Sequence, residues 1–256
     1  MNQVELRFFP KSRRVALREL NGFDEQSIRG THTLAAIGLL DRLLVENPVY
    51  PLGPEKSAGL AVPDRDRLLA AIYIQTFGSR IVGTILCGNC RQLFDLDFSL
   101  DQLRLFVESG SSPGIERQPD ATFRLADGCV FRLPTGVDEC AVADLPLPEA
   151  EAALLARCVL EPGNGLDAQT LWRVCEEVGS GIDLDLKADC PECAYSQFIH
   201  FDIQTYLLTA IQQEQHSLMR DIHRLAAAYG WSLHEILELT RSQRHALVNL
   251  IENEHR

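Results

Sequence analysis

The chain has 256 residues, of which 46% are hydrophobic and 23% are charged, with 36 acidic residues against 24 Lys and Arg and a formal net charge of −12 at pH 7. This composition is typical of a folded globular protein of one large or two modest domains and excludes a disordered chain. So acidic a chain is repelled by a phosphate backbone, which argues against nucleic acid as its partner. Because we find neither a secretory signal nor 18 consecutive apolar residues, we expect a cytoplasmic protein without a membrane span.

The first segment is predicted to begin with two strands. Residues 4–9 alternate between polar and apolar side chains, and residues 14–20 could form the neighbouring strand. Asn21-Gly22 then interrupts the pattern.

Two helices are expected before the first cysteine pair. Asp24 is a suitable N-cap, and apolar residues recur with a helical period between residues 34 and 44. Residues 47–63 are rich in Pro and Gly, which favours a loop. Asp64 is predicted to cap a second helix that ends near Gly78.

Two cysteine pairs have the spacing of zinc knuckles: Cys87-Gly88-Asn89-Cys90 and Cys190-Pro191-Glu192-Cys193. A knuckle is a tight turn that directs two thiolates at one ion, and structural zinc is normally bound by four ligands. In a reduced compartment, eight cysteines are more easily explained by thiols and metal ligands than by disulfides. The sequence therefore predicts one closed site in which Cys87, Cys90, Cys190 and Cys193 bind a structural Zn²⁺.

The separation of about a hundred residues between the pairs is longer than in a compact zinc ribbon. The flanking sequences explain it, because each pair lies in the order strand, knuckle, strand, helix. Residues 78–81 precede the first pair, which 94–98 and the helical run 100–107 follow. Residues 179–182 precede the second pair, which 198–203 and the helical run 206–211 follow. We therefore expect two half-repeats that pair about a pseudo-twofold axis with the metal between them.

The residues between the half-repeats are predicted to form an inserted subdomain. A flexible linker is expected at residues 109–114. A hairpin is expected at residues 121–134 around Asp127-Gly128, a favoured turn pair. Helices are expected at residues 148–160 and 167–178.

The chain is predicted to be helical from about residue 204 to its end. Ser232 with Glu235, and Thr240 with Gln243, have the spacing of capping boxes and mark two helix starts. The tail is thus expected to hold one long helix and two short ones.

Other readings of the cysteines remain open. Either pair could be a redox dithiol, although such motifs usually open a helix and these are flanked by predicted strands. The remaining cysteines lack a metal spacing and are interpreted as small buried hydrophobic residues: Cys129, Cys140, Cys158 and Cys175.

We find no constellation of residues that indicates an enzyme. The sequence has no phosphate-binding glycine loop, no HExxH motif and no evident nucleophile with a base. A hydrolase with an open zinc position is disfavoured, because four cysteines fill the site. The acidic pairs Asp183/Asp185 and Glu176/Glu177 are interpreted as solvated.

Histidines and arginines are frequent in the tail. The histidines are interpreted as solvated or interfacial. The arginines with His245 could form a binding face for acidic protein or nucleic acid, but they alternate with glutamates, which favours a mixed-charge helix surface. These residues are His216, His223, His234, His245 and His255, with Arg220, Arg224, Arg241 and Arg244.

Three stretches resemble the T4-type phage baseplate protein family, whose relatives also occur in contractile injection systems. They are Leu17–Glu25 (LRELNGFDE), Phe131–Asp138 (FRLPTGVD) and His223–Leu237 (HRLAAAYGWSLHEIL). The order of these stretches, together with the split cysteine pairs, carries the resemblance over most of the chain. The Arg241–Arg244 stretch departs from it, since it is less basic than the arginine run typical of the family.

The resemblance implies a structural or assembly component of a contractile tail baseplate that contacts other baseplate, hub or tail proteins. It would act in the producing cell or be built into the assembled particle. The residues and the resemblance together predict an α+β protein with a central split Cys₄ zinc ribbon. Its predicted parts are N-terminal strands and helices (1–77), the ribbon halves (78–108 and 179–211), the insertion (109–178) and the helical tail (212–256). The alternative function is a zinc-ribbon adaptor that binds nucleic acid or the transcription machinery; the net charge argues against it.

Overall fold

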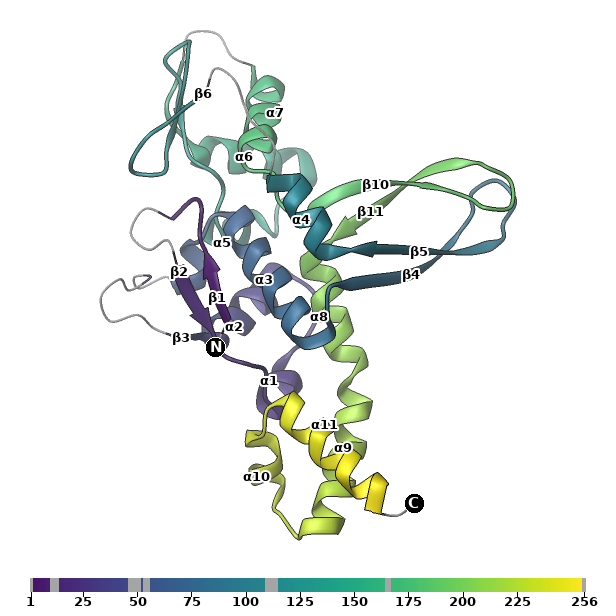
Figure 1. Ribbon diagram of the computed structural model, residues 1–256. Helices are drawn as coiled ribbons and strands as arrows, with labels where there is room; N and C mark the ends of the chain where they lie inside the picture. The colour runs from purple at the N-terminus through teal and green to yellow at the C-terminus, as the bar shows by residue number, and fades with distance from the viewer. Residues whose placement is uncertain are drawn as a thin grey trace.

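The computed structural model describes residues 2–9, 14–45, 52, 56–108, 115–163 and 167–254. The predicted linker at 109–114, His255 and part of the Pro-rich loop lie outside the described residues. Within them the chain combines helices with antiparallel strands, which confirms the α+β class (Figure 1).

Ten elements are formed by the described residues up to Glu108. In order they are β1 (Asn2–Glu5), β2 (Arg14–Leu17), α1 (Gly22–Ser27), α2 (Thr33–Leu43), β3 (Leu44–Val45), η1 (Lys56–Gly59), α3 (Val62–Phe77), β4 (Arg80–Leu86), β5 (Leu93–Ser99) and α4 (Leu100–Glu108).

The described residues from Ile115 onward form thirteen more. They are β6 (Ile115–Arg117), β7 (Phe123–Leu125), β8 (Val130–Phe131), α5 (Gly136–Val142), α6 (Leu147–Cys158), β9 (Val159–Glu161), α7 (Ala168–Val178), β10 (Asp183–Asp189), β11 (Ser196–Asp202), α8 (Ile203–Gln213), α9 (Gln215–Tyr229), α10 (Leu233–Glu238) and α11 (Arg241–Glu254).

The same order of elements occurs twice along the chain. From β2 and β8 onward, and leaving aside η1 of the first unit, the order in residues 2–108 is β2, α1, α2, β3, α3, β4, β5, α4. In the second unit, residues 115–213, it is β8, α5, α6, β9, α7, β10, β11, α8. The sequence predicted this repeat only from the strand before each cysteine pair onward. The structure extends it over most of the chain.

The sheet at the start of each unit has the same three-stranded arrangement, to which the second unit adds β6. In the first, β2 lies between β1 and β3, and in the second β8 lies between β7 and β9, with all pairs antiparallel. The backbone N–H of Arg18, just after β2, donates to the carbonyl of Leu43 at 3.0 Å. At the equivalent place the N–H of Arg132 donates to the carbonyl of Cys158 at 2.9 Å. Helices α1 and α5 therefore each follow a strand end that is held by an equivalent backbone hydrogen bond.

Among the described residues, two hydrophobic cores hold the body together and a third lies among the C-terminal helices. The largest combines the first sheet, α2 and α3 with α8, so the two units share it; the buried residues Leu68, Leu207 and Leu208 belong to it. A second core lies inside the second unit around Phe131. A third, around Leu225, joins α9, α10 and α11. Burial of apolar surface in these clusters supplies the main favourable free energy of folding.

Two predicted helix caps are wrong by three residues. Helix α1 begins earlier than expected, with Asn21 as N-cap, while Asp24 is the third helical residue and completes a capping box. Helix α3 follows Ala61, and Asp64 is again its third residue. The Asp64 carboxylate instead accepts hydrogen bonds from the backbone N–H groups of Arg7 and Phe8, at 2.7 and 2.8 Å. Acidic residues are favourable anywhere in the first turn, so the sequence alone does not distinguish these positions.

Most other predicted elements are confirmed, but the single long helix expected from residue 204 to Gly230 is divided at Glu214 into α8 and α9. The hairpin around Asp127-Gly128 is formed by β7 and β8, and the capping box of Ser232 with Glu235 starts α10. Thr240 and Gln243 exchange hydrogen bonds at the start of α11. The sequence did not predict α5 or the short strands β3, β6 and β9.

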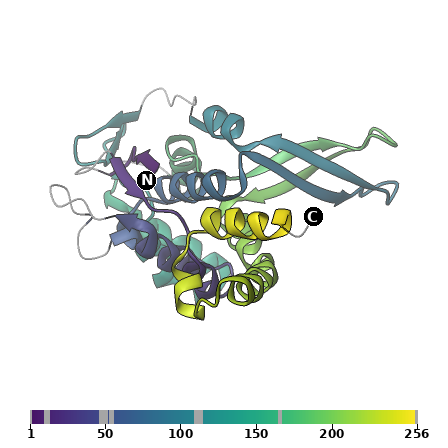
Figure 2. The ribbon, with the colours of Figure 1, turned by 60° about the horizontal axis from the view of Figure 1, so that its bottom comes forward.

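The two cysteine hairpins project from the body as an arm, and the C-terminal helices form a separate lobe below it (Figures 1 and 2). Along the described ranges, no helix has both the length and the apolar character that crossing a membrane requires.

Candidate metal centre

Each cysteine pair lies at the tip of a two-stranded antiparallel hairpin. Strands β4 and β5 carry the first pair, and β10 and β11 carry the second, each with seven residue pairs in register. The side chains that alternate onto the inner faces of both hairpins form a small apolar core: Ile85, Phe94, Leu96, Ala188 and Ile199. The arm is therefore held together along its length by apolar contacts and at its tip by the cysteines.

The two knuckles have the same backbone structure. In the first, the N–H of Cys87 donates to the carbonyl of Gln92 at 2.9 Å, and the N–H of Arg91 donates back to Cys87 at 3.1 Å. In the second, Cys190 donates to Tyr195 at 2.9 Å and Ala194 donates to Cys190 at 2.9 Å. The residue after each second cysteine has a left-handed backbone, with φ of 63° at Arg91 and 56° at Ala194. Such a turn brings both thiols of a pair to one side.

The four sulfur atoms converge at the arm tip. Sγ of Cys87 lies 3.7 Å from Sγ of Cys193, and Sγ of Cys90 lies 3.7 Å from Sγ of Cys190. All four lie within 4.8 Å of one another. A tetrahedral ion with metal–sulfur bonds of about 2.3 Å separates its ligands by roughly 3.8 Å, whereas a disulfide bond is only about 2.05 Å long. The four thiols therefore fit the shape of a tetrahedral metal site.

The contacts between sulfurs are reciprocal. The first cysteine of each pair approaches the last cysteine of the other pair, at the same distance in both cases. A twofold axis through the cluster would exchange the two contacts. This agrees with the predicted pseudo-twofold arrangement of the half-repeats.

Hydrogen bonds at the tip favour the thiolate form of Cys87 and Cys193. At Cys90 the N–H of Gln92 is outweighed by burial and by contacts with the other thiols, which raise the pKa to about 12. The backbone N–H groups of Cys90 and Asn89 point at the sulfur of Cys87 and lower the pKa of that thiol. The side-chain amide of Asn89 donates to Cys193 across the arm, at 3.6 Å, and lowers the pKa of Cys193 to about 6. Thiolates are the form of cysteine that binds metals.

A glutamine also fastens one hairpin to the other. The side-chain oxygen of Gln197 accepts a hydrogen bond from the N–H of Gly88 at 2.8 Å. Its amide nitrogen donates to the carbonyl of Leu86 at 3.2 Å. The second hairpin thereby holds the first knuckle on both sides of Cys87.

The four cysteines are the one group in the described part of the chain that could hold a metal ion with three or more His, Cys, Asp or Glu ligands. Cys87 and Cys190 are buried, and Cys90 and Cys193 are partly exposed. The predicted ligands are thus all brought together, and the structure supports a metal site at these four positions.

The other cysteines lie outside this site. Cys129, Cys158 and Cys175 are buried in the second unit, as predicted, and Cys140 is only partly buried. Burial raises the pKa of Cys175 to about 12. Buried thiols of this kind are unreactive.

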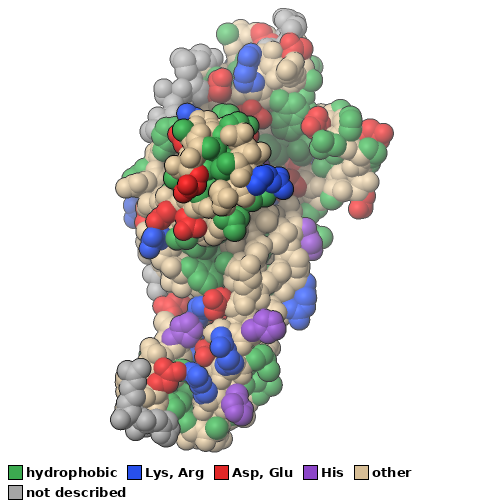
Figure 3. All heavy atoms as spheres, turned by 90° about the vertical axis from the view of Figure 1, so that its right-hand side faces the viewer, with side chains coloured by type: hydrophobic (Ala, Val, Ile, Leu, Met, Phe, Trp, Pro, Cys, Tyr) green, Lys and Arg blue, Asp and Glu red, His purple; other side chains and the backbone are tan. Residues whose placement is uncertain are grey.

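The acidic pairs and the four described tail histidines, His216, His223, His234 and His245, are largely exposed, as predicted. Asp183 and Asp185 flank His200 on the outer face of the arm, at 3.2 and 3.4 Å. His234 packs on the ring of Phe23, and His245 lies 3.6 Å from Asp221. In Figure 3, His and Arg side chains gather over the C-terminal lobe.

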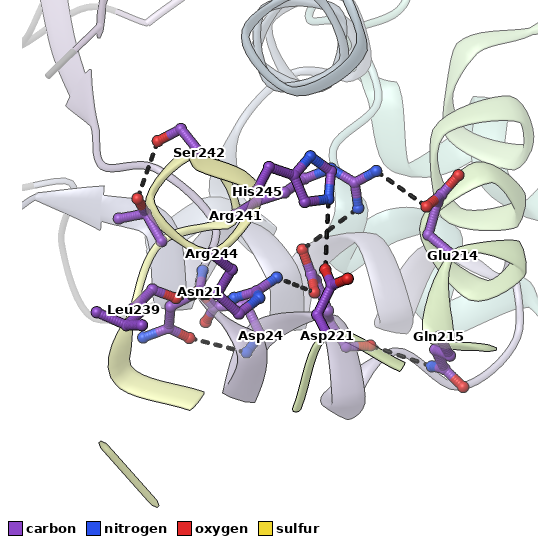
Figure 4. A network of polar contacts seen from close by, with 12 residues as sticks. Asn21, Asp24, Glu214, Gln215, Asp221, Leu239, Arg241, Ser242, Arg244 and His245 are labelled. Carbon is purple, nitrogen blue, oxygen red and sulfur yellow. Dashed lines mark hydrogen bonds and ion pairs between the residues drawn. The ribbon is translucent and has the colours of Figure 1, made fainter. Parts of the chain in front are cut away.

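Two of the tail arginines are not surface residues, which corrects the prediction. The side chain of Arg244 is 1% exposed and donates from Nη2 to the buried carboxylate of Glu25 at 2.5 Å (Figure 4). Arg241 is 15% exposed and lies between Glu25 and Glu214, at 3.6 and 2.9 Å. The partner Glu25 lies more than two hundred residues away, so charge patterning along the tail could not reveal it.

Comparisons with protein-family models, with curated proteins and with solved structures give no match.

Proposed function

We propose that the four cysteines bind one structural zinc ion and that the arm is a split zinc ribbon. The single observation that carries this proposal is the convergence of four thiols from two hairpins a hundred residues apart. Thiolates in a tetrahedral arrangement are preferred by zinc, and four protein ligands leave no position for water or substrate. Zinc would then stabilise the fold and would take no part in a reaction.

We further propose that the protein is a non-enzymatic component or assembly factor of a contractile phage tail or injection-system baseplate. The sequence resemblance motivates the particular machine. The closed ligand set supports a structural role for the metal, and the projecting arm and separate C-terminal lobe provide two surfaces for contacts with other subunits (Figure 1). Baseplate, hub or tail proteins are therefore the proposed partners.

The test is assembly of particles in a producing cell that lacks this chain. We expect incomplete tails or a strongly reduced yield of contractile particles, seen by electron microscopy, and recovery when the intact chain is supplied. Co-purification of the tagged chain with tail components is the accompanying measurement. Normal particles in the absence of the chain would contradict the proposal.

The arm can be tested separately in the same cells. A chain with Cys190→Ser should fail to restore assembly, whereas Cys140→Ser, outside the metal centre, should restore it. If Cys190→Ser restores full assembly, the metal centre is not needed for this function.

A further inference from the structure

A pattern of eight residues occurs once in each unit, at the point where a strand leads into a short helix. It reads Arg, two variable residues, Asn or Thr, Gly, a variable residue, Asp, Glu. The first copy follows β2 and has Arg18, Asn21, Gly22, Asp24 and Glu25; the second follows β8 and has Arg132, Thr135, Gly136, Asp138 and Glu139. We refer to residues 18–25 and 132–139 as the first and second docking segments.

The two docking segments have the same internal hydrogen bonds. The Arg18 guanidinium binds the Asp24 carboxylate through two bonds of 2.6 and 2.9 Å, and Arg132 binds Asp138 at the same two distances. Both aspartates are buried and complete a capping box. Bidentate ion pairs of this kind fix the geometry of a short segment.

Each docking segment binds the first turn of a helix from elsewhere in the chain. The N–H of Arg241, the first residue of α11, donates to the carbonyl of Leu20 at 3.0 Å. Likewise the N–H of Val62, the first residue of α3, donates to the carbonyl of Pro134 at 3.0 Å.

An isolated antiparallel bridge accompanies each of these backbone bonds. Asn21 pairs with Thr240, just before α11, and Thr135 pairs with Ala61, just before α3. Both helix starts are therefore held in the same register against their docking segment.

An ion pair made by a buried arginine completes each contact. Arg244, the fourth residue of α11, binds Glu25, and Arg65, the fourth residue of α3, binds Glu139. Arg244 and Arg65 are 1% and 4% exposed. A buried arginine that loses its carboxylate is left with an uncompensated charge, so the pair discriminates strongly against a helix start without arginine.

The glycine of each docking segment permits close approach of a further element, α10 in the first copy and α2 with η1 in the second. A Cβ on Gly22 would lie 2.5 Å from Cδ2 and 3.0 Å from Cα of Leu237. A Cβ on Gly136 would lie 2.9 Å from Ile37 and 3.2 Å from the carbonyl oxygen of Ala58. In both copies the backbone around the glycine is packed against another element.

We propose that the two segments are copies of one docking module, which recognises the first turn of a helix that carries arginine at its fourth position. The second module joins the second unit to α3 of the first. The first module holds α11, and with it the C-terminal lobe, on the first unit. The lobe is thus attached by the same contact that joins the units.

The proposal is tested on the full-length protein by hydrogen exchange of the α11 amides, because local opening of the lobe exposes them. Glu25→Gln removes the charge that Arg244 requires, and we expect exchange in α11 to become at least about 10-fold faster. Glu238→Gln, at an exposed glutamate of the same lobe, is the control and should leave it unchanged. The amides of β4 and β5 should keep their protection in both variants.

Recognition by a shared module is distinguished from a single ion pair by exchanging the cap residues. Asn21→Thr introduces the residue of the second segment and should keep the α11 amides protected. Asn21→Ala should make hydrogen exchange of the α11 amides about fivefold faster. The proposal is overturned if Asn21→Thr opens α11 as much as Asn21→Ala. It is also overturned if exchange in the Glu25→Gln protein equals that of the Glu238→Gln control.

Discussion

Cys87 and Cys193 lie 106 residues apart in the chain, yet their sulfur atoms are 3.7 Å apart at the tip of the arm. The sulfur atoms of Cys90 and Cys190 are also 3.7 Å apart. The two hairpins therefore meet symmetrically around the space that four ligands would enclose. Without a bound metal, four thiols at this distance would have little reason to remain together, since thiol hydrogen bonds are weak. The arm is therefore the part of the molecule whose stability should depend most on metal.

Replacing one ligand should loosen the arm. For Cys190→Ser we expect loss of the metal and a thermal midpoint lower by several degrees, because the binding free energy of a structural zinc is also folding free energy. Calorimetry with metal analysis of the same sample is the measurement. Cys140→Ser is the control and should keep both the metal and the midpoint; equal midpoints for the two variants would contradict the prediction.

The glycine at the start of α1 should not tolerate a side chain. Gly22→Ala places a Cβ against the backbone of Leu237, and we expect a loss of roughly 2 kcal/mol in the free energy of unfolding. Gly38→Ala is the matched control, since it lies in α2 with no atom within 4 Å of the added Cβ. It should stabilise the protein by about 0.5–1 kcal/mol, as alanine does in a helix. Urea titration of both variants measures the two effects, and equal effects would show that the contact at Gly22 is unimportant.

Asp138 should contribute to stability at neutral pH and lose this contribution in acid. Burial alone would raise the pKa of its carboxyl group, but hydrogen bonds from Arg132, Thr135 and Arg157 outweigh burial and hold the pKa well below its ordinary range. A lowered pKa means that the stabilisation is present above the unfolded-state pKa and falls as pH drops below it. Asp138→Asn should therefore destabilise the protein by roughly 2–4 kcal/mol at pH 7 and less at pH 3. A pH-independent difference in urea midpoints would contradict this.

Asp66 should behave in the opposite way. It is buried where α3 meets the start of β10, and burial raises its pKa to about 7, although Arg65 and the N–H of Ile182 act against the rise. A raised carboxyl pKa gives stability that is fully present below the unfolded-state pKa, near 4, and is lost as pH rises toward 7. Asp66→Asn should remove this loss. The free energy of unfolding of the variant should therefore rise relative to that of the parent by about 1 kcal/mol or more between pH 4 and pH 8. If both proteins vary equally with pH, Asp66 is ionised at little cost.

Much of the metal centre could be predicted from the sequence because its signals are local. The spacing within each cysteine pair determines the knuckle, and alternation in the flanking segments determines the strands. Ser232 and Glu235 likewise lie within one helical turn, and their capping box is confirmed. Local patterns of this kind do not depend on where the rest of the chain folds.

The docking contacts could not be predicted in the same way because they join distant residues. Nothing near Arg244 indicates that its partner is Glu25, and a charged residue on a helix is usually exposed. The similarity between residues 18–25 and 132–139 was nevertheless present in the sequence. Alignment of the chain with itself would have revealed that residues 132–139 repeat residues 18–25, including the Arg, Asp and Glu positions that form ion pairs.

The most direct test of the central claim is the metal content of the purified, reduced full-length protein, measured by elemental analysis together with native mass spectrometry. We predict one zinc ion per chain, its loss on treatment with a strong chelator, and four of the eight cysteines becoming reactive only after that loss. A metal-free protein with an equally stable arm would contradict the claim, as would a disulfide bond among Cys87, Cys90, Cys190 and Cys193.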